Sequence, residues 1–462
     1  MIKIYLDWNV MAQMKNGFHQ ELKEIVLNND KLLIPYSTSH IGDIFSSFKE
    51  NDEQNKLINE DLEFISALTN NLFLSNDGKV VTLDSASPKE YYQQKLEEKD
   101  FYKDLSIEWL FKGIADDEFI NSLIQPYISI LSQMPLDNVF KDAFSNPESS
   151  KQFEILFPGL KENLTMEGFF KSFSELYKGL NNNDKYKDLR DFIQKSLNIN
   201  RDKLFDNHSP YELIEKSYNR IGLSPIQKLE YENVAPQWFN EITNEYILLD
   251  MHGYQEDKVN VDKGRKETFK NTTEDAFHAA FASTCNFYVV NDNKSYKKTK
   301  QVFKKLNINT VVFKPAEFID YYKKYLDVIE PIQNIRLINK TLEQDAFIEQ
   351  QIEDGLLRTY YLPYFLFDFF NKILVVIPNN SDPEIIVLSR IKPNNSRLYI
   401  FEIKNLVIKI TSLLGPDIDN YGEVLEDEFK EEEWIGREWV IGTSIFRLVS
   451  TNGYIQLYID RK

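Results

Sequence analysis

Two apolar runs that lie far apart in the chain both lead into an aspartate. Ile2–Leu6 is followed directly by Asp7, and Phe287–Val290 is followed by Asn291 and Asp292. Short apolar runs bounded by polar turn residues predict buried β-strands. In an open α/β sheet, sites form beyond the carboxyl ends of the parallel strands. Asp7 and Asp292 are therefore expected to lie close together at one edge of such a sheet.

Two more aspartates are expected at the same edge. Asp43 falls in the first turn of a helix predicted to begin after Ser39, a good N-cap. Asp275 stands at the start of a helix that leads into the second apolar run. Carboxylates held this close repel one another unless a cation neutralises them. The predicted catalytic and metal-ligating residues are Asp7, Asp43, Asp275 and Asp292.

Carboxylate oxygens are the ligands that Mg²⁺ and Mn²⁺ prefer. Bound ions of this kind activate water and orient a phosphodiester for hydrolysis. The chain has no Gly-x-Ser-x-Gly sequence, no Gly-rich phosphate loop ending in Lys-Ser/Thr, and no closely spaced Cys and His set. The sequence therefore favours acid-and-metal chemistry over an activated Ser or Cys nucleophile.

The order of these motifs resembles that of the PIN-domain nucleases, a family that includes the toxin ribonucleases of bacterial toxin–antitoxin pairs. The segments concerned are Leu6-Asp7-Trp8-Asn9-Val10, Asp43, Asp275-Ala-Phe-His278-Ala-Ala-Phe-Ala, and Val289-Val290-Asn291-Asp292. The resemblance covers about residues 1–75 and 265–330. It implies a parallel sheet flanked by helices and Mg²⁺- or Mn²⁺-dependent hydrolysis of single-stranded RNA or structured nucleic acid.

The resemblance also implies roles for individual residues. Asp7 is the first-strand acid, Asp43 stands where the family commonly has Glu, Asp275 is the helix acid, and Asp292 is the acid after the fourth strand. Asn9 matches an Asn that fixes the first turn and touches the water shell of the metal. The chain departs from the family at Trp8 and Asn291, which replace small hydroxyl residues, and in the long stretch between Asp43 and Asp275.

Each of these residues also has a plainer interpretation. Asp7 and Asp292 suit a helix cap or a turn, and Asp275 suits the first turn of a helix, where the dipole favours acids. Glu274 is adjacent and could substitute for Asp275. His40 and His278 are expected to be packed, hydrogen-bonded supports rather than bases.

The net charge of -18 argues against a protein that coats nucleic acid through charge alone. Residues 258–305 nevertheless hold eleven Lys and Arg against five Asp and Glu. Lysines 297, 298, 300, 304 and 305 fit either a solvated helix face or phosphate contacts. Residues 417–433 hold nine acids and one Lys, which suits an exposed loop or an acidic flap that competes with nucleic acid. The predicted substrate-binding residues are Asn9, Asn291, Lys294, Lys297 and Lys298.

The fold class expected is α/β, with a PIN-like parallel sheet in residues 1–330 and a helical insertion at about 90–250. Residues 331–462 are expected to form a mainly antiparallel β domain, with a hairpin at Asn452-Gly453. Strands are predicted at 373–377, 384–389, 397–403, 406–410, 439–449 and 453–459, and a helix at 343–361.

The function expected is a metal-dependent endonuclease that prefers RNA. A role as a bacterial defence or stress effector, including antiviral defence, follows only by family analogy. The expected partners are nucleic acid and a regulatory protein that binds the β domain. No apolar run approaches the ~20 residues of a membrane span, no signal peptide is expected, and the single cysteine, Cys285, is expected to be a buried thiol, so a cytoplasmic protein is expected.

Two other functions remain open. A haloacid-dehalogenase-like phosphatase also places an Asp after its first strand, but it needs a second acid two residues later, where this chain has Asn9. A catalytically degenerate PIN-like scaffold that binds a protein or nucleic acid is the non-enzymatic alternative.

Overall fold

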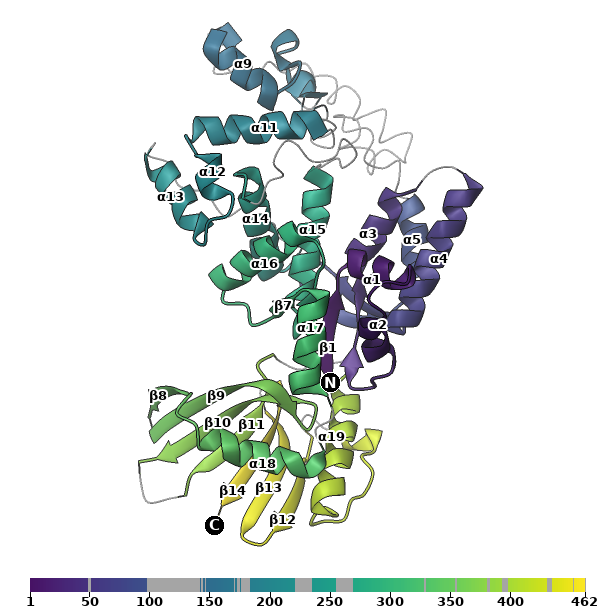
Figure 1. The fold of residues 1–462 in the computed structure, drawn as a ribbon, viewed down its shortest axis with the longest axis vertical. Coiled ribbons are helices and arrows are strands. Elements are labelled where there is room, and N and C mark those ends of the chain that lie inside the picture. The colour runs from purple at the N-terminus through teal and green to yellow at the C-terminus, as the bar shows by residue number, and fades with distance from the viewer. Residues whose placement is uncertain are drawn as a thin grey trace, which may run out of the picture.

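The structure is a computed structural model in which a parallel sheet with its helices lies next to a separate antiparallel sheet (Figure 1). It describes residues 1–48, 51–97, 147–169, 183–220, 235–254, 269–327, 330–353, 355–379, 383–392, 398–429, 434–451 and 453–461, with a few single residues between 142 and 175. The parts of the predicted insertion and basic stretch at 98–141, 221–234 and 255–268 lie outside the described residues.

The central sheet has four parallel strands in the order β2-β1-β6-β7. They are β1 (Ile2–Leu6), β2 (Leu32–Leu33), β6 (Phe287–Val289) and β7 (Val311–Phe313). Strands β1 and β6 are neighbours in this sheet, although more than 280 residues separate their registered pair Leu6 and Val289. The predicted parallel sheet flanked by helices is confirmed.

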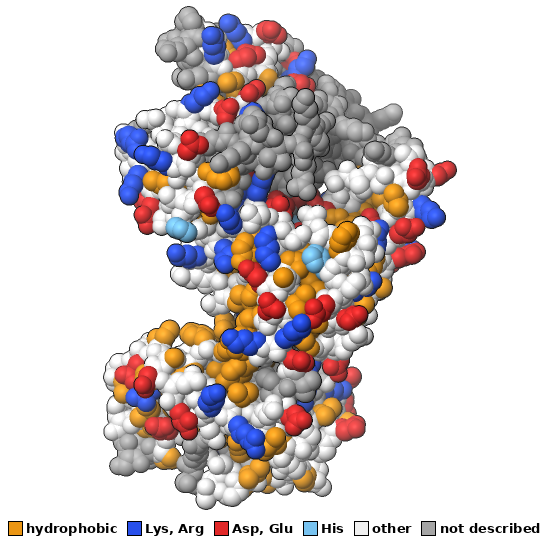
Figure 2. Space-filling view, in the orientation of Figure 1, with side chains coloured by type: hydrophobic (Ala, Val, Ile, Leu, Met, Phe, Trp, Pro, Cys, Tyr) orange, Lys and Arg blue, Asp and Glu red, His pale blue; other side chains and the backbone are white. Residues whose placement is uncertain are grey.

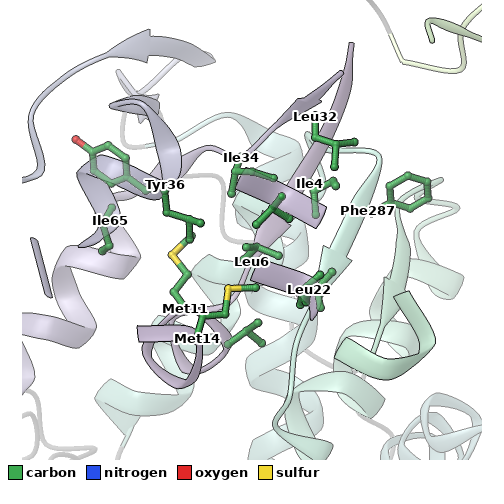
Figure 3. Close-up of a cluster of buried hydrophobic side chains, with 14 of the residues drawn as sticks. Ile4, Leu6, Met11, Met14, Leu22, Leu32, Ile34, Tyr36, Ile65 and Phe287 are labelled. Atoms are coloured by element: carbon green, nitrogen blue, oxygen red, sulfur yellow. The ribbon is translucent and has the colours of Figure 1, made fainter. Parts of the chain in front are cut away.

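Alternation along the central strands divides the core into two layers. Ile4, Leu6 and Phe287 pack on one face, which α1 (Trp8–Lys15), α2 (Gln20–Leu27), α4 (Asp52–Thr69) and α17 (Pro315–Tyr321) cover (Figure 3). Tyr5 and Tyr288 point to the other face, which α14 (Gln237–Met251), α15 (Phe269–Ala282) and α16 (Asn293–Lys305) cover.

Two predicted elements of the first third are divided in the structure. The helical spacing of residues 10–27 predicts one helix, but the structure has α1 and α2, separated near Gly17 at φ +89°, a backbone conformation that favours glycine. The apolar run over 32–35 predicts one strand, but the structure has β2 and β3 (Tyr36–Ser37), because Pro35 lacks the N–H that a continuous ladder needs. Strand β3 starts a second sheet with β4 (Leu72–Asn76) and β5 (Val81–Ser85).

The described part of the insertion is helical, as predicted. Its other elements are α5 (Pro88–Glu97), α9 (Pro147–Leu156), η1 (Leu160–Glu162), α11 (Asn183–Ser196), α12 (Arg201–Leu204) and α13 (Pro210–Arg220). Ile214 of α13 and Tyr246 of α14 share one core with Tyr288 of β6. The carboxyl-terminal part of the insertion is therefore built into the central domain.

The C-terminal domain is a seven-stranded antiparallel sheet in the order β12-β13-β14-β11-β10-β9-β8. Its strands are β8 (Ile348–Ile352), β9 (Gly355–Leu366), β10 (Phe370–Pro378), β11 (Ile385–Ser389), β12 (Arg437–Ile441), β13 (Ser444–Thr451) and β14 (Tyr454–Arg461). The pairing of Thr451 with Tyr454 confirms the predicted hairpin. The helices α18 (Pro331–Leu342) and α19 (Tyr399–Leu414) pack on this sheet.

Four predicted elements of this domain are wrong. The strand expected over 439–449 is divided into β12 and β13, which pair as a hairpin around a turn at Gly442, φ +59°. The helix expected over 343–361 is the hairpin β8–β9, whose partner β10 supplies the pairing that local sequence does not show. The strands expected over 397–403 and 406–410 belong to the helix α19, with residues 393–397 outside the described part. Ile403, Leu406, Val407 and Ile410 recur at helical spacing and are buried, so their β-branched content concealed a helix.

The regular elements that the structure describes include no helix long and apolar enough to cross a membrane.

Candidate functional site

Asp7 and Asp292 lie at the carboxyl ends of adjacent strands, and each caps the helix that follows. The Asp7 N–H donates to the Val289 carbonyl at 2.9 Å, which places Asp7 directly beside β6. Its carboxylate accepts from the Asn9 N–H at 3.3 Å at the start of α1. The Asp292 carboxylate accepts from the Lys294 and Ser295 N–H groups at 2.9 and 2.8 Å at the start of α16. The capping and site interpretations therefore apply together, because the cap fixes each carboxylate at the sheet edge.

Asp43 reaches the same edge from α3 (Thr38–Ser46), which packs against α15. The N-cap of α3 is Ser37 rather than Ser39, so Asp43 lies in its second turn. Gly42 leaves room for the Glu274 carboxylate of α15, because a Cβ there would stand 2.6 Å from Glu274 Oε1. Asp43 and α15 are thereby joined by a 2.9 Å ion pair between Asp43 Oδ2 and His278 Nε2.

Asp275 lies well inside α15, which begins by Phe269 rather than at 273 as predicted. It is therefore not a first-turn acid, and the helix dipole does not explain it. Burial raises the pKa of Asp275 well above its usual value, and the charges of Asp7, Asp43 and Asp292 raise it further. All four predicted carboxylates thus lie within range of mutual repulsion.

The pKa of Asp7 is also raised by burial and by the neighbouring carboxylates. Asp7 is 5% exposed, and burial raises its pKa to about 6. The charge of His278 opposes this rise, whereas Asp43 and Asp292 add to it. The Tyr288 hydroxyl also donates to Asp7 Oδ1 at 3.4 Å.

The two histidines form a buried hydrogen-bond chain with Tyr5. Burial alone would lower the pKa of His278, but its hydrogen bond to Asp43 and the nearby acids outweigh this and raise the pKa to about 9. Its second nitrogen, Nδ1, bonds the Tyr5 hydroxyl at 2.8 Å. His40 accepts from the Ser37 N–H and donates to the Leu6 carbonyl at 2.8 Å, and burial lowers its pKa well below the usual value. Both histidines are buried and hydrogen-bonded, as expected, and their role as supports rather than bases stays a prediction.

The predicted substrate-binding residues are in different situations. Asn9 is exposed on the first turn of α1, and Asn291 donates to Gln13 Oε1 at 3.0 Å. Lys294 lies partly exposed at the start of α16, whereas Lys297 forms a 2.7 Å ion pair with Asp206 of the insertion. All except Lys298 remain on or near the surface around the sheet edge.

Lys298 is 4% exposed and forms a salt bridge with the buried Asp250. Arg190 at 3.2 Å, the Tyr186 hydroxyl at 2.6 Å and the Thr272 hydroxyl at 3.2 Å also donate to Asp250. The pKa of Asp250 lies well below its usual value, because Lys298, Arg190 and Tyr186 outweigh the effect of burial. Lys298 therefore links α16 to the insertion, and we remove it from the predicted phosphate contacts because its amine has no access to a ligand.

Lys314 is a cation at this edge that the sequence analysis did not identify. It directly follows β7, and its Nζ donates to the Asn291 carbonyl at 2.6 Å. Burial lowers its pKa, while Asp292, Glu317 and Asp7 act in the opposite sense. The rule that selected Asp7 and Asp292, a polar residue just beyond a parallel strand, would also have selected Lys314.

The carboxylates satisfy the charge requirement of a divalent ion without forming a finished ligand set. In the described ranges, no group of three or more His, Cys, Asp and Glu side chains is arranged to hold a metal ion. His278 is turned toward Asp43 and supplies part of the neutralising charge. Binding an ion through three or more of these acids would therefore require their side chains to rearrange.

The acidic run at 417–433 binds within its own domain where it is described. The guanidinium of Arg437 lies 2.7 Å from Glu428 and 3.9 Å from Asp417, and residues 430–433 lie outside the described part. These contacts support the interpretation as a structured loop rather than a flap over the basic stretch.

Compared with known proteins, the chain matches no family model, no curated protein and no solved structure.

Proposed function

We propose that this protein is a metal-dependent nuclease that hydrolyses phosphodiester bonds. The observation that carries the proposal is the gathering of Asp7, Asp43, Asp275 and Asp292 at one sheet edge, where burial and mutual repulsion raise the pKa of Asp7 to about 6 and that of Asp275 well above normal. Such crowding costs stability, and a bound divalent cation would relieve it.

Asp7, Asp43, Asp275 and Asp292 are the residues that would hold Mg²⁺ or Mn²⁺. The ion, when bound, supplies an activated water and charge stabilisation at the phosphate. The backbone N–H bonds at Asp7 and Asp292 fix the positions of two carboxylates before any ligand arrives. Lys314 is placed to neutralise a phosphate oxygen beside them.

RNA is the proposed substrate, on the strength of the resemblance to PIN-domain nucleases and the parallel sheet they share. By the same analogy we propose a bacterial defence or stress role, in the cytoplasm, with the C-terminal domain as the site of a regulatory protein partner.

A catalytically degenerate scaffold is the second candidate. The His278–Asp43 ion pair favours it, because a protonated histidine already occupies one face of a predicted ligand. A scaffold of this kind would keep the fold and a binding surface without needing an ion.

Cleavage of labelled single-stranded RNA and DNA tests the main proposal. The native chain is compared with Asp7→Asn and Asp292→Asn in Mn²⁺, Mg²⁺ or EDTA, with Asp206→Asn as a surface control. Loss of a residue that merely supports a ligand costs about 10- to 100-fold, so loss of a ligand should reduce cleavage by more than about 100-fold. Cleavage that persists in EDTA or in both site variants would contradict the proposal.

Thermal unfolding with added Mn²⁺ separates the two candidates without relying on activity. A ligand that binds only the folded chain raises the unfolding temperature. The nuclease proposal expects such a shift for the native chain and a smaller one for Asp292→Asn. A scaffold would give no shift in either.

A further inference from the structure

A groove of about 520 Å³ runs between α16 and the edge strand β7. Lysines 300 and 304 stand on its rim, and Phe303, Ile308, Val312 and Phe313 contribute apolar surface. Basic side chains gather over this part of the molecule, whereas basic and acidic side chains are mixed over the rest of the visible face (Figure 2). The volume lies within the range of small-ligand sites, so the groove can accept a nucleoside-sized group.

The lysines of α16 divide into two sets by their partners. Lys297, Lys298 and Lys305 form ion pairs with Asp206, Asp250 and Glu245 of the insertion. Those three charges are therefore neutralised within the protein.

The groove side of α16 differs. Tyr296, Lys300 and Phe303 recur at helical spacing on one face, with Lys304 beside them. Lys300 bonds the Tyr296 hydroxyl at 3.1 Å and lies over the Tyr296 ring, with Nζ 4.8 Å from the centroid. Neither Lys300 nor Lys304 has a carboxylate partner in the part of the chain that the structure describes. These exposed amines are the ones that remain for an anionic ligand.

Tyr296 connects the groove to the carboxylate site. Lys314 lies over its ring, with Nζ 4.9 Å from the centroid, and the same Lys314 bonds the Asn291 carbonyl next to Asp292. The Tyr296 hydroxyl donates to Glu317 at 3.2 Å, which holds the ring at the groove wall. A nucleic-acid strand that extends from the carboxylate site past Lys314 would therefore contact Tyr296 next.

Alternating cations beside an aromatic platform suit single-stranded nucleic acid, whose phosphates bind the cations while an unpaired base packs on the ring. A duplex keeps its bases stacked inside and cannot offer one to Tyr296. The overall charge of -18 gives no general attraction for RNA, so any affinity has to come from local contacts of this kind.

We propose that the groove between α16 and β7 binds single-stranded RNA on one side of the cleaved bond. A base packs against Tyr296 and the apolar wall, and the flanking phosphates bind Lys300, Lys304 and Lys314. Lys300 turns from the Tyr296 ring to a phosphate as the base enters. This inference rests on the proposed nuclease function for its substrate class, but its binding step needs no ion.

The test measures the binding of a fluorescein-labelled single-stranded oligoribonucleotide by anisotropy, in EDTA so that no cleavage occurs. Tyr296→Ala should weaken binding by about 5- to 150-fold, the loss expected for one base stack of about 1–3 kcal/mol. Tyr296→Phe keeps the ring and should bind within about threefold of the native chain. Circular dichroism and thermal unfolding check that each variant folds.

The cation contacts have their own readout. Lys300→Ala combined with Lys304→Ala should weaken binding and reduce the slope of log affinity against log salt by about 1.4, which is two single-strand phosphate contacts. Lys297→Ala, on the same helix but paired with Asp206, is the matched control and should change the slope little.

The outcomes separate this inference from the nuclease proposal. Native affinity in both Tyr296→Ala and the double lysine variant would overturn the inference even if the chain cleaves RNA. Lost binding in these variants supports the inference even if no cleavage is found. A native chain that binds no single-stranded RNA also overturns it.

Discussion

The two ends of the central parallel sheet differ in charge: carboxylates lie at the carboxyl end, and buried cations lie at the amino end. At the carboxyl end, Asp7, Asp275 and their neighbours repel one another. At the amino end, Lys3 is buried where β1 meets the C-terminal domain, and Glu402 of α19 pairs with Arg390 at 2.9 Å and with the amino terminus of Met1 at 3.3 Å. Like charges repel at one end, whereas a carboxylate offsets the cations at the other.

Domain contact explains the difference. Lys392 of the C-terminal domain donates to the Ser283 carbonyl and to the Thr310 hydroxyl at 2.8 Å. These hydrogen bonds join the C-terminal domain to the amino end of the parallel sheet. Charges enclosed in this way must be paired, because solvent cannot screen them. Among the described residues, no printed contact joins the β domain to the carboxyl end, and like-charge repulsion of this kind is common at functional sites.

The largest expected effect comes from breaking the paired end. Glu402→Gln leaves Arg390 and Lys3 in one enclosed space without a carboxylate, which should lower the free energy of unfolding by about 3–5 kcal/mol. Urea denaturation measures the change. Glu349→Gln, which breaks an exposed pair with Arg358, should cost less than about 1 kcal/mol. Equal effects of the two variants would show that the amino end is not strained by charge.

At the carboxyl end the corresponding change should stabilise the fold. The pKa of Asp7 is about 6 when folded against 3.8 as its ordinary value, so the folded chain holds more protons there between these pH values and stability falls as the pH rises through this window. Asp7→Asn removes the charge and keeps a good N-cap, and should raise the free energy of unfolding at pH 7.5 by about 1–3 kcal/mol.

Urea denaturation of Asp7→Asn and Asp206→Asn side by side makes the measurement. The surface variant should change stability by no more than about 0.5 kcal/mol. A destabilised Asp7→Asn chain would indicate that the carboxylate is held by attraction rather than by repulsion.

The smallest effect is a pH slope at the domain boundary. Burial lowers the pKa of Lys392 from 10.5 to about 7. Between those values the unfolded chain binds the extra proton, so this group makes stability rise with pH by up to about 1.4 kcal/mol per pH unit. Lys392→Met should remove that rise between pH 7 and 9, as measured by denaturation at several pH values. Parallel pH profiles for the two chains would contradict the assignment.

Local patterns allowed the carboxyl end of the sheet to be predicted. The alternation of Ile2–Leu6 and the polar stop at Asp7 are encoded in a few neighbouring residues, as is the hairpin at Gly453. Patterns gave no such help for Lys298, which is four residues beyond Lys294 and looks like any exposed helix lysine. Its burial depends on Asp250, 48 residues away in the chain.

The same limit explains the errors in the C-terminal domain. Ile and Val in α19 resemble strand residues until the sheet beneath them is known, and β8 and β9 resemble a helix until β10 pairs with β9. Lys314 directly follows a parallel strand, so the rule that selected Asp7 also applies to it, but its place beside Asp292 depends on β7 pairing with β6, and strand order is not a local property.

The sequence by itself determined the parallel strands, the acids at their ends and the presence of a separate β-rich domain, because apolar periodicity and polar boundaries act over a few residues. Only the tertiary structure decided which charges meet. It joined His278 to Asp43, hid Lys298 against Asp250, brought Lys314 beside Asp292 and buried Glu402 at the domain boundary. Those outcomes depend on distances in space between segments that are up to 235 residues apart in the chain, and electrostatic energy is set by distance and burial rather than by order along the chain.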